Sequence, residues 1–246
     1  MRHGFRATVR RGVIFCGNKV NAARPSARRR SRERAHVDRV FDESLGIDTS
    51  KLRVTSRNDA VGQHWAGGQR YEALDPRFDF GAALSDLDIA FDEFVFVDVG
   101  AGMGRGLFIA SQLPFKRIVG VEYSAELVRI AHENIRAAES IRPASIPLEV
   151  VHADALEYEL PNDSLVLYLF NPFDRPVMTK YVKHVQASYE AAPRRIVVVY
   201  LNPRHAELWQ EARCFEHVRD WGGASIFDTG PRLLCTASGN GRHRVG

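Results

Sequence analysis

The sequence predicts an α/β protein whose core is a doubly wound, mostly parallel sheet of seven strands with helices on both faces. Three observations lead to this prediction. From residue 94 onward, short apolar segments alternate with segments of helical periodicity, as they do in strand–helix–strand units. The apolar segments are continuous, which is typical of strands covered on both faces. A glycine-rich loop follows the first strand directly and opens the next helix.

The individual elements can be placed from their apolar positions and their end signals. Strands are expected over 94–99, 117–122, 148–152, 164–170, 196–200, 215–221 and 232–237, the last two as a closing pair. Between them, helices are expected over 107–113, 124–139 and 203–211. A further helix begins after Asp174, whose carboxylate suits an N-cap. Residues 77–93 also carry apolar positions at helical spacing.

Charge divides the chain into a basic arm and an acidic domain. Residues 1–40 hold 12 Lys and Arg against two acids, whereas the rest of the chain holds 22 basic against 28 acidic residues. We therefore expect a basic, disordered arm over 1–35, a helical lead-in or lid over 36–93 and the domain over 94–240. Nucleic-acid contacts are expected only through the arm, because the acidic domain repels phosphates.

Composition excludes several classes of protein. The 246 residues are 45% hydrophobic and 26% charged, which is ordinary for a globular chain. No apolar stretch approaches the roughly 18 residues that a membrane-spanning helix needs. The three cysteines, Cys16, Cys214 and Cys235, are widely spaced, so neither a zinc knuckle nor a disulfide framework is supported. A reducing, cytoplasmic location is therefore expected.

The glycine-rich loop spans residues 98–104 and reads Asp-x-Gly-x-Gly-x-Gly. Glycines at these positions allow a tight turn and a close approach of the backbone to a ligand. The helix that follows offers free N–H groups to an anionic group. A dinucleotide-binding loop would read Gly-x-Gly-x-x-Gly, and its third glycine would fall on Arg105. The loop therefore does not fit that class.

This loop resembles the first motif of the class I S-adenosylmethionine-dependent methyltransferases, and the resemblance continues across residues 94–201. The overall pattern is similar to small bacterial methyltransferase-domain proteins. The resemblance implies a Rossmann-like fold, S-adenosylmethionine as cofactor and methyl transfer as activity. The chain is more distantly similar to the Dot1-like histone methyltransferases. It is also distantly similar to a mitochondrial group of protein-lysine methyltransferases whose glycine loop continues with an arginine, as Arg105 does here.

The resemblance also implies roles for the acids that follow the first three strands. Asp98 is expected near the methionine ammonium group, Glu122 on the ribose hydroxyls and Asp154 on the adenine amino group. A carboxylate suits the ribose because it can accept hydrogen bonds from both hydroxyls. Further cofactor contacts are expected from Gly100, Ala101, Gly102, Gly104, Tyr123, Ala155, Asn171 and Tyr71.

The fourth strand ends in Asn171-Pro172-Phe173, which partly resembles the Asn-Pro-Pro-Tyr/Phe motif of methyltransferases that modify planar amines. Asn171 and Phe173 are expected to align the acceptor. Because the motif has only one proline here, nucleic-acid or glutamine specificity does not carry over. The same residues also suit a simple turn into a capped helix. A second Asn-Pro pair, Asn202-Pro203, follows the fifth strand.

A polar segment over 58–71 is expected to form a lid over the cofactor, with His64, Trp65 and Tyr71 available for stacking and proton transfer. Methyl transfer is an SN2 attack on a sulfonium carbon, so the protein mainly has to align the reactants. The sequence offers no metal-ligand cluster and no dedicated base.

The sequence thus predicts a methyltransferase that acts on an unidentified small molecule or protein side-chain nitrogen. Two alternatives stay open. One is a non-catalytic module that senses the cofactor or binds nucleic acid through the arm. The other is an NAD(P)-dependent oxidoreductase, which the loop spacing and the absence of a Tyr-x-x-x-Lys pair disfavour.

Overall fold

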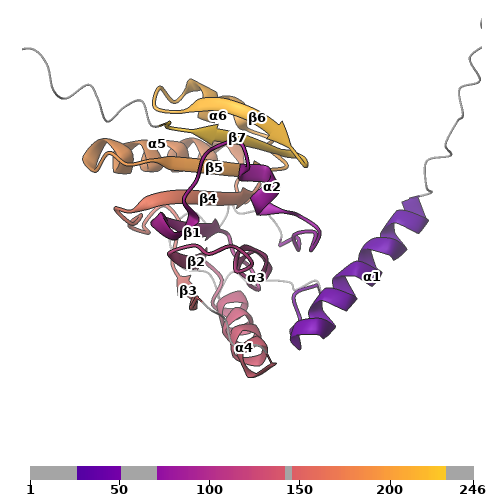
Figure 1. Cartoon of the computed structure of the whole chain (residues 1–246). Helices are drawn as coiled ribbons and strands as arrows, with labels where there is room; N and C mark the ends of the chain where they lie inside the picture. The colour runs from indigo at the N-terminus through magenta and orange to yellow at the C-terminus, as the bar shows by residue number, and fades with distance from the viewer. Residues whose placement is uncertain (1–26, 51–70, 142–145, 231–246) are drawn as a thin grey trace, which may run out of the picture.

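The computed structural model describes residues 27–50, 71–141 and 146–230 of the chain. In these residues, one seven-stranded sheet forms the centre of the fold (Figure 1). The strands are β1 (Phe94–Val99), β2 (Arg117–Glu122), β3 (Leu148–His152), β4 (Ser164–Phe170), β5 (Ile196–Leu201), β6 (Glu216–Trp221) and β7 (Ala224–Asp228). Their order is β3-β2-β1-β4-β5-β7-β6; β7 is antiparallel to β5 and β6 on its two sides, and all other neighbouring strands are parallel. The predicted α/β class and the mostly parallel sheet are confirmed.

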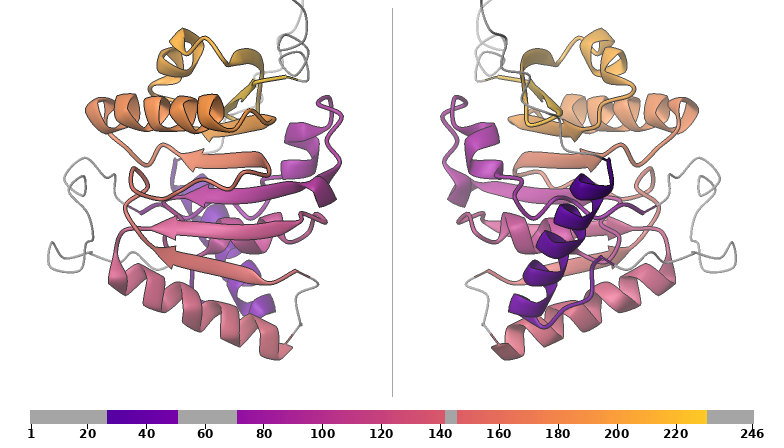
Figure 2. Two further views of the ribbon diagram at one scale, coloured as in Figure 1. Left: turned by 90° about the vertical axis from the view of Figure 1, so that its left-hand side faces the viewer. Right: turned by 90° about the vertical axis from the view of Figure 1, so that its right-hand side faces the viewer.

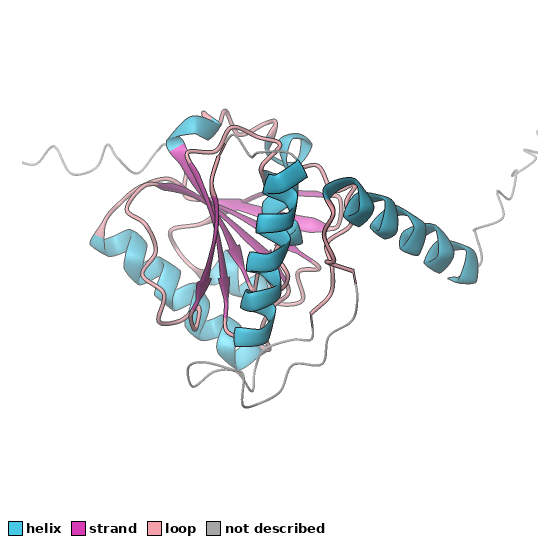
Figure 3. Ribbon diagram, turned by 90° about the horizontal axis from the view of Figure 1, so that it is seen from below, coloured by secondary structure: helices cyan, strands magenta, loops and turns pink. Residues whose placement is uncertain are grey.

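Helices cover both faces of the sheet, and the strands twist between them (Figures 2 and 3). One face packs against α2 (Phe80–Leu84), α3 (Arg105–Ala110) and α4 (Ala125–Ile141). The other face packs against α5 (Arg175–Ala191) and α6 (Ala206–Glu211). Every residue of β1 is buried, as expected for a central strand covered on both sides. No helix among the described residues combines the length and the hydropathy that crossing a bilayer requires.

The helix α5 forms where its local signals place it. The Oδ1 atom of Asp174 accepts a hydrogen bond from the backbone N–H of Val177 at 3.0 Å, which confirms the predicted N-cap. Pro176 lies in the first turn, where a missing N–H leaves no hydrogen bond unmade. An apolar stripe then faces the sheet and buries Val177, Met178, Tyr181, Val182 and Val185.

The N-terminal helix α1 (Ala27–Leu45) begins inside the region that the sequence assigns to the arm. Residues 27–35 are therefore helical, and only residues 1–26 of the expected arm lie outside the described residues. The difference arises because Arg34 has partners in the folded protein. Its guanidinium donates to Asp38 at 2.9 Å and to the carbonyl oxygen of Ala73 at 2.7 Å, and it pairs with Asp75 at 3.1 Å. The N-terminal end of α1 still projects away from the sheet (Figure 1).

The closing strand pair differs from the prediction. The strand next to β5 is β7 (Ala224–Asp228), whereas the predicted strand over 232–237 lies outside the described residues. Gly222 and Gly223 both have positive φ, at 58° and 85°, and they join β6 to β7 as a two-residue hairpin turn. A Gly-Gly pair is a recognised signal for this turn, and the prediction overlooked it.

The segment before β1 is less helical than its apolar spacing suggests. Over 77–93 it forms only the five-residue helix α2 and the 3₁₀ turn η3 (Phe91–Glu93). Its apolar side chains are nevertheless buried against the sheet, including Phe80, Leu84 and Leu87. Burial of these side chains therefore accounts for the periodic pattern without a long helix.

Candidate functional site

The candidate site lies at the carboxyl edge of the parallel strands. Strand order changes direction between β1 and β4, because the chain passes from β1 to β2 on one side and later returns to β4 on the other. Ligands of doubly wound sheets bind at such a switch point, outside the carboxyl ends of the strands. The glycine loop follows β1 at this point, and Asn171 follows β4 beside it.

The glycine loop adopts positive φ angles, which residues other than glycine disfavour. Gly100, Gly102 and Gly104 have φ values of 80°, 56° and 90°. The backbone N–H groups of Gly100 and Ala101 donate to the carbonyl oxygen of Val121 at 2.9 and 3.1 Å. The loop is thereby fixed to the end of β2, with α3 beginning immediately after it.

Glu122 fixes the next part of the loop. Its carboxylate is 3% exposed, and its two oxygens accept hydrogen bonds from the backbone N–H groups of Gly102 and Ser124, both at 2.9 Å. Burial raises the pKa of this carboxyl, and the backbone hydrogen bonds oppose that rise. Each carboxylate oxygen has a second lone pair, so Glu122 can still accept hydrogen bonds from a ligand diol.

Asp98 is a second buried carboxyl beside the same loop, at 4% exposure. A Cβ added at Gly106 would lie 2.2 Å from its Oδ2, so this carboxyl rests against the first turn of α3. Burial and the negative charge of Glu122 raise the pKa of Asp98 to about 8. The site therefore holds two carboxyl groups that a positively charged ligand would stabilise in their ionised form.

Asp154 follows β3 and completes the row of acids. It is buried, and its Oδ1 accepts a hydrogen bond from the backbone N–H of Leu156 at 3.0 Å. The N–H of Ala153 donates to the carbonyl oxygen of Glu122 at 3.0 Å, so the loops after β2 and β3 are joined. The ring Nε2 of His152 lies 3.0 Å from the carbonyl oxygen of Tyr123. Ala155 is partly buried and packs against the hydrophobic core on one face of the sheet.

The substrate side is marked by Asn171, which is buried and has φ 43°. The hydroxyl of Tyr200 donates to its Oδ1 at 3.0 Å. A Cβ added at Gly100 would lie 3.1 Å from Cβ of Pro172, so the turn after β4 touches the glycine loop. Phe173 instead packs against Tyr181 of α5, with ring centroids 5.4 Å apart.

Asn202 repeats the backbone geometry of Asn171 after the next strand, with φ 51°. Its backbone N–H donates to the carbonyl oxygen of Gly223 at 3.1 Å. Both Asn-Pro turns therefore place an asparagine in the left-handed region, which asparagine tolerates better than most residues. The two turns end the neighbouring strands β4 and β5 at the same edge of the sheet.

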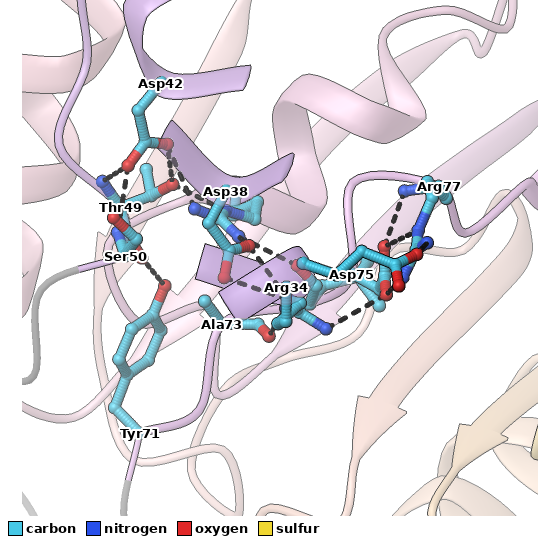
Figure 4. A network of polar contacts seen from close by, with 12 residues as sticks. Arg34, Asp38, Asp42, Thr49, Ser50, Tyr71, Ala73, Asp75 and Arg77 are labelled. Carbon is cyan, nitrogen blue, oxygen red and sulfur yellow. Dashed lines mark hydrogen bonds and ion pairs between the residues drawn. The ribbon is translucent and has the colours of Figure 1, made fainter. Parts of the chain in front are cut away.

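Tyr71 lies over the glycine loop. A Cβ added at Gly102 would meet its Cδ2 and Cε2 at 2.1 Å, so the ring rests directly on this glycine. Its hydroxyl donates to the carbonyl oxygen of Thr49 at 2.8 Å (Figure 4). Burial raises the pKa of the phenol above its ordinary value. The other two proposed lid residues, His64 and Trp65, lie outside the described residues.

Arg105 joins this loop to the lead-in, through partners that the sequence analysis did not identify. Its side chain is 1% exposed, and its Nε and Nη2 donate to Thr49 Oγ1 at 2.6 Å and to Asp42 Oδ1 at 3.0 Å. Its Nη1 donates to the carbonyl oxygen of Leu74 at 3.0 Å and to Asp38. Figure 4 shows the acids and Thr49 gathered in this network. The spacing of two acids one helical turn apart in α1 was the available signal.

Among the described residues, no group of three or more His, Cys, Asp or Glu side chains is placed to hold a metal ion. The residues at the carboxyl edge of the sheet instead provide the glycine loop, the buried carboxyls and the buried amide of Asn171. These groups suit an organic ligand with positive charge and hydroxyl groups.

Comparison with known proteins finds a family match in the central part of the chain. Residues 97–196 match the family model described as "Methyltransferase domain". A comparison with curated proteins finds no significant match.

Several solved structures are similar to this chain. Magnesium protoporphyrin IX methyltransferase from Synechocystis PCC 6803 is 15% identical, with a TM-score of 0.44, over 60% of this chain and 74% of that one. A SAM dependent methyltransferase from Aquifex aeolicus is 15% identical, with a TM-score of 0.45, over 62% and 88%. TrmN from Thermus thermophilus is 16% identical, with a TM-score of 0.43, over 60% of this chain and 46% of that one.

The family match falls on the strands and loops described above, from β1 to the start of β5. It includes the glycine loop and all three acids at the carboxyl edge. The sheet order and the glycine cradle fit a bound S-adenosylmethionine, which supplies an electrophilic methyl group on a sulfonium. Over residues 97–196, this chain therefore matches the methyltransferase-domain family.

Proposed function

We propose that the domain transfers the methyl group of its cofactor to a nitrogen atom of a small molecule or of a protein side chain. The acceptor's lone pair attacks the methyl carbon, the carbon–sulfur bond breaks and its electron pair stays on sulfur. Such a step needs alignment of the two reactants more than it needs a catalytic group. The observation that carries the proposal is the position of Asn171, buried at the end of β4 and in contact with the glycine loop through Pro172.

The acids are assigned to the cofactor. We assign Asp98 to the ammonium group, Glu122 and Tyr123 to the ribose, and Asp154 and Ala155 to the adenine. Buried Asp98 and Glu122 support this assignment because S-adenosylmethionine brings both an ammonium and a sulfonium charge to them. A dinucleotide would bring a pyrophosphate next to these carboxyls, and like charges repel.

Asn171 is assigned to the acceptor. Its amide oxygen and the backbone carbonyl oxygens of this turn can accept hydrogen bonds from the protons of an amine. The lone pair of that nitrogen is then free to point at the methyl group. Tyr200 supports this role because its hydroxyl holds the amide in place at 3.0 Å. We assign Phe173 a supporting role beside Asn171, through its packing on α5.

The nitrogen assignment is tested with cofactor that carries a tritiated methyl group. A lysine-rich peptide and a panel of small primary and aromatic amines serve as acceptors. We expect labelled amine whose tritiated methyl group is retained in mild base, because base would release a methyl group carried as an ester. Label that is lost entirely in base would contradict a nitrogen acceptor.

Glu122→Ala is expected to weaken S-adenosylhomocysteine binding by about 100-fold, because it removes hydrogen bonds to the ribose and releases the Gly102 N–H. Isothermal titration calorimetry measures the change. Glu133→Ala is the matched control, because this glutamate is exposed on α4 and pairs only with Arg129 in the described structure. Equal affinities of Glu122→Ala and the wild-type protein would overturn the ribose assignment.

A further inference from the structure

The hydroxyl of Tyr168 is a buried polar group that the proposed function leaves unused. Tyr168 lies in β4 and is 2% exposed. Its hydroxyl oxygen has no hydrogen-bond partner among the described residues. Buried hydroxyls nearly always have a hydrogen-bond partner, because a buried hydroxyl without a hydrogen bond destabilises the folded protein. The exception therefore points to a group that arrives from outside the chain.

Packing alone does not account for a tyrosine at this position. Its ring contacts those of Phe80, Phe96 and Phe78, with centroids 5.0, 6.2 and 6.3 Å away. All three neighbours are phenylalanines, so a phenylalanine at position 168 would fill the same space without an unpartnered oxygen. The surrounding rings also hold the phenol in one orientation.

The hydroxyl belongs to the same part of the fold as Asp98. Asp98 and Tyr168 are register partners on the adjacent strands β1 and β4, and paired residues of parallel strands face the same side of the sheet. Both approach Gly106, where an added Cβ would lie 2.2 Å from Asp98 Oδ2 and 3.4 Å from Tyr168 Cε1. The Asp98 carboxyl and the Tyr168 ring therefore both pack against the first turn of α3.

We infer that Tyr168 is a cofactor-positioning residue whose hydroxyl, together with the Asp98 carboxylate, binds the ammonium group of the methionine moiety. This inference rests on the proposed assignment of Asp98. The phenol oxygen accepts a hydrogen bond from the ammonium group, which also pairs with the Asp98 carboxylate. Burial and the charge of Asp98 raise the pKa of Tyr168 well above its ordinary value, so the hydroxyl stays neutral.

The test compares ligands that differ at the methionine end. S-adenosylhomocysteine carries the ammonium group, whereas 5′-methylthioadenosine keeps the adenosine and the thioether but lacks both the ammonium and the carboxylate. Decarboxylated S-adenosylmethionine keeps the amine alone. Each is titrated calorimetrically into the full chain as wild type, Tyr168→Phe and Tyr181→Phe. Tyr181 is a matched control because it is a buried tyrosine on the opposite face of the sheet.

Tyr168→Phe is expected to weaken the binding of S-adenosylhomocysteine and decarboxylated S-adenosylmethionine by about 10-fold or more. It should weaken the binding of 5′-methylthioadenosine by less than about twofold. Tyr181→Phe should change none of them. The ligand-free Tyr168→Phe protein should melt at the wild-type temperature or above, because the substitution removes an unpartnered buried oxygen.

Three results would overturn the inference. One is unchanged S-adenosylhomocysteine affinity in Tyr168→Phe, which would leave an ordinary core tyrosine whose hydroxyl binds a water molecule. Another is an equal loss for all three ligands, which would indicate a general change of the site. If the wild-type protein binds none of the ligands, the cofactor assignment itself fails and the inference fails with it.

Discussion

Replacing Arg105 with methionine is expected to lower the free energy of unfolding by about 3–5 kcal/mol. The guanidinium is buried and donates to Thr49, Asp42, Asp38 and the Leu74 carbonyl. Methionine fills much of the same volume but leaves Asp42 buried without its cationic partner. Removing one member of a buried ion pair is costly for this reason. Urea denaturation followed by circular dichroism measures the change.

Arg129→Met is the matched control, because Arg129 pairs with Glu133 on the exposed side of α4 and its side chain is 59% exposed. A change within about 0.5 kcal/mol is expected there. Adding Asp38→Asn and Asp42→Asn to Arg105→Met should recover part of the loss, because the unpaired charges are removed. A loss below about 1 kcal/mol in Arg105→Met would contradict a structural role for this network.

The affinity for S-adenosylhomocysteine is expected to rise about tenfold from pH 6 to pH 7 and to level off above pH 8. The pKa of Asp98 in the ligand-free protein is about 8, because of burial and the charge of Glu122. The ammonium group of the ligand favours the ionised carboxylate, so binding releases a proton below that pH. Calorimetry in buffers with different ionisation enthalpies measures the proton release directly.

Asp98→Asn isolates the titrating group, since Glu122 also has a raised pKa. This variant should bind more weakly and should lose most of the pH dependence. Glu133→Gln is the control, because this glutamate is exposed on α4, where it pairs with Arg129. An affinity of the wild-type protein that stays constant between pH 6 and 8 would contradict the assignment of Asp98.

The same carboxyl sets a pH dependence of stability. The folded pKa of about 8 lies above the ordinary value of 3.8, so the folded protein holds this proton more tightly than the unfolded chain does. The resulting stabilisation is complete below about pH 4 and is lost as the pH rises to about 8. Asp98→Asn should remove this part of the dependence of stability on pH. In the wild-type protein, bound cofactor should offset the loss of stability at higher pH.

Much of the fold could be predicted because its signals are local. The predicted and observed bounds of the first four strands agree, and the Asp174 cap marks the start of α5. The first strand of the closing pair lies where it was predicted, but β7 was missed because its signal lies in the Gly222-Gly223 turn rather than in its apolar residues. The start of α1 was missed because its basic residues resemble a solvated arm, while the contacts of Arg34 come from residues 73 and 75.

The site was predictable only in part. The three acids lie at or after the ends of three successive strands, and the three glycines follow the first of these strands. Sequence order alone therefore predicts that they meet at one edge. The partners of Arg105 lie 31 to 67 residues away along the chain, and no local pattern reports such contacts. The unpartnered hydroxyl of Tyr168 is likewise invisible in the sequence, where an apolar strand residue suggests packing alone. These two features depend on how the lead-in folds back over the sheet.

The most direct test of the account is a calorimetric titration of the full chain with S-adenosylhomocysteine and, separately, with NADH at pH 8. We expect a micromolar dissociation constant for S-adenosylhomocysteine and no binding of NADH, because the buried carboxyls favour a cationic ligand over a pyrophosphate. Binding of NADH without binding of S-adenosylhomocysteine would contradict it.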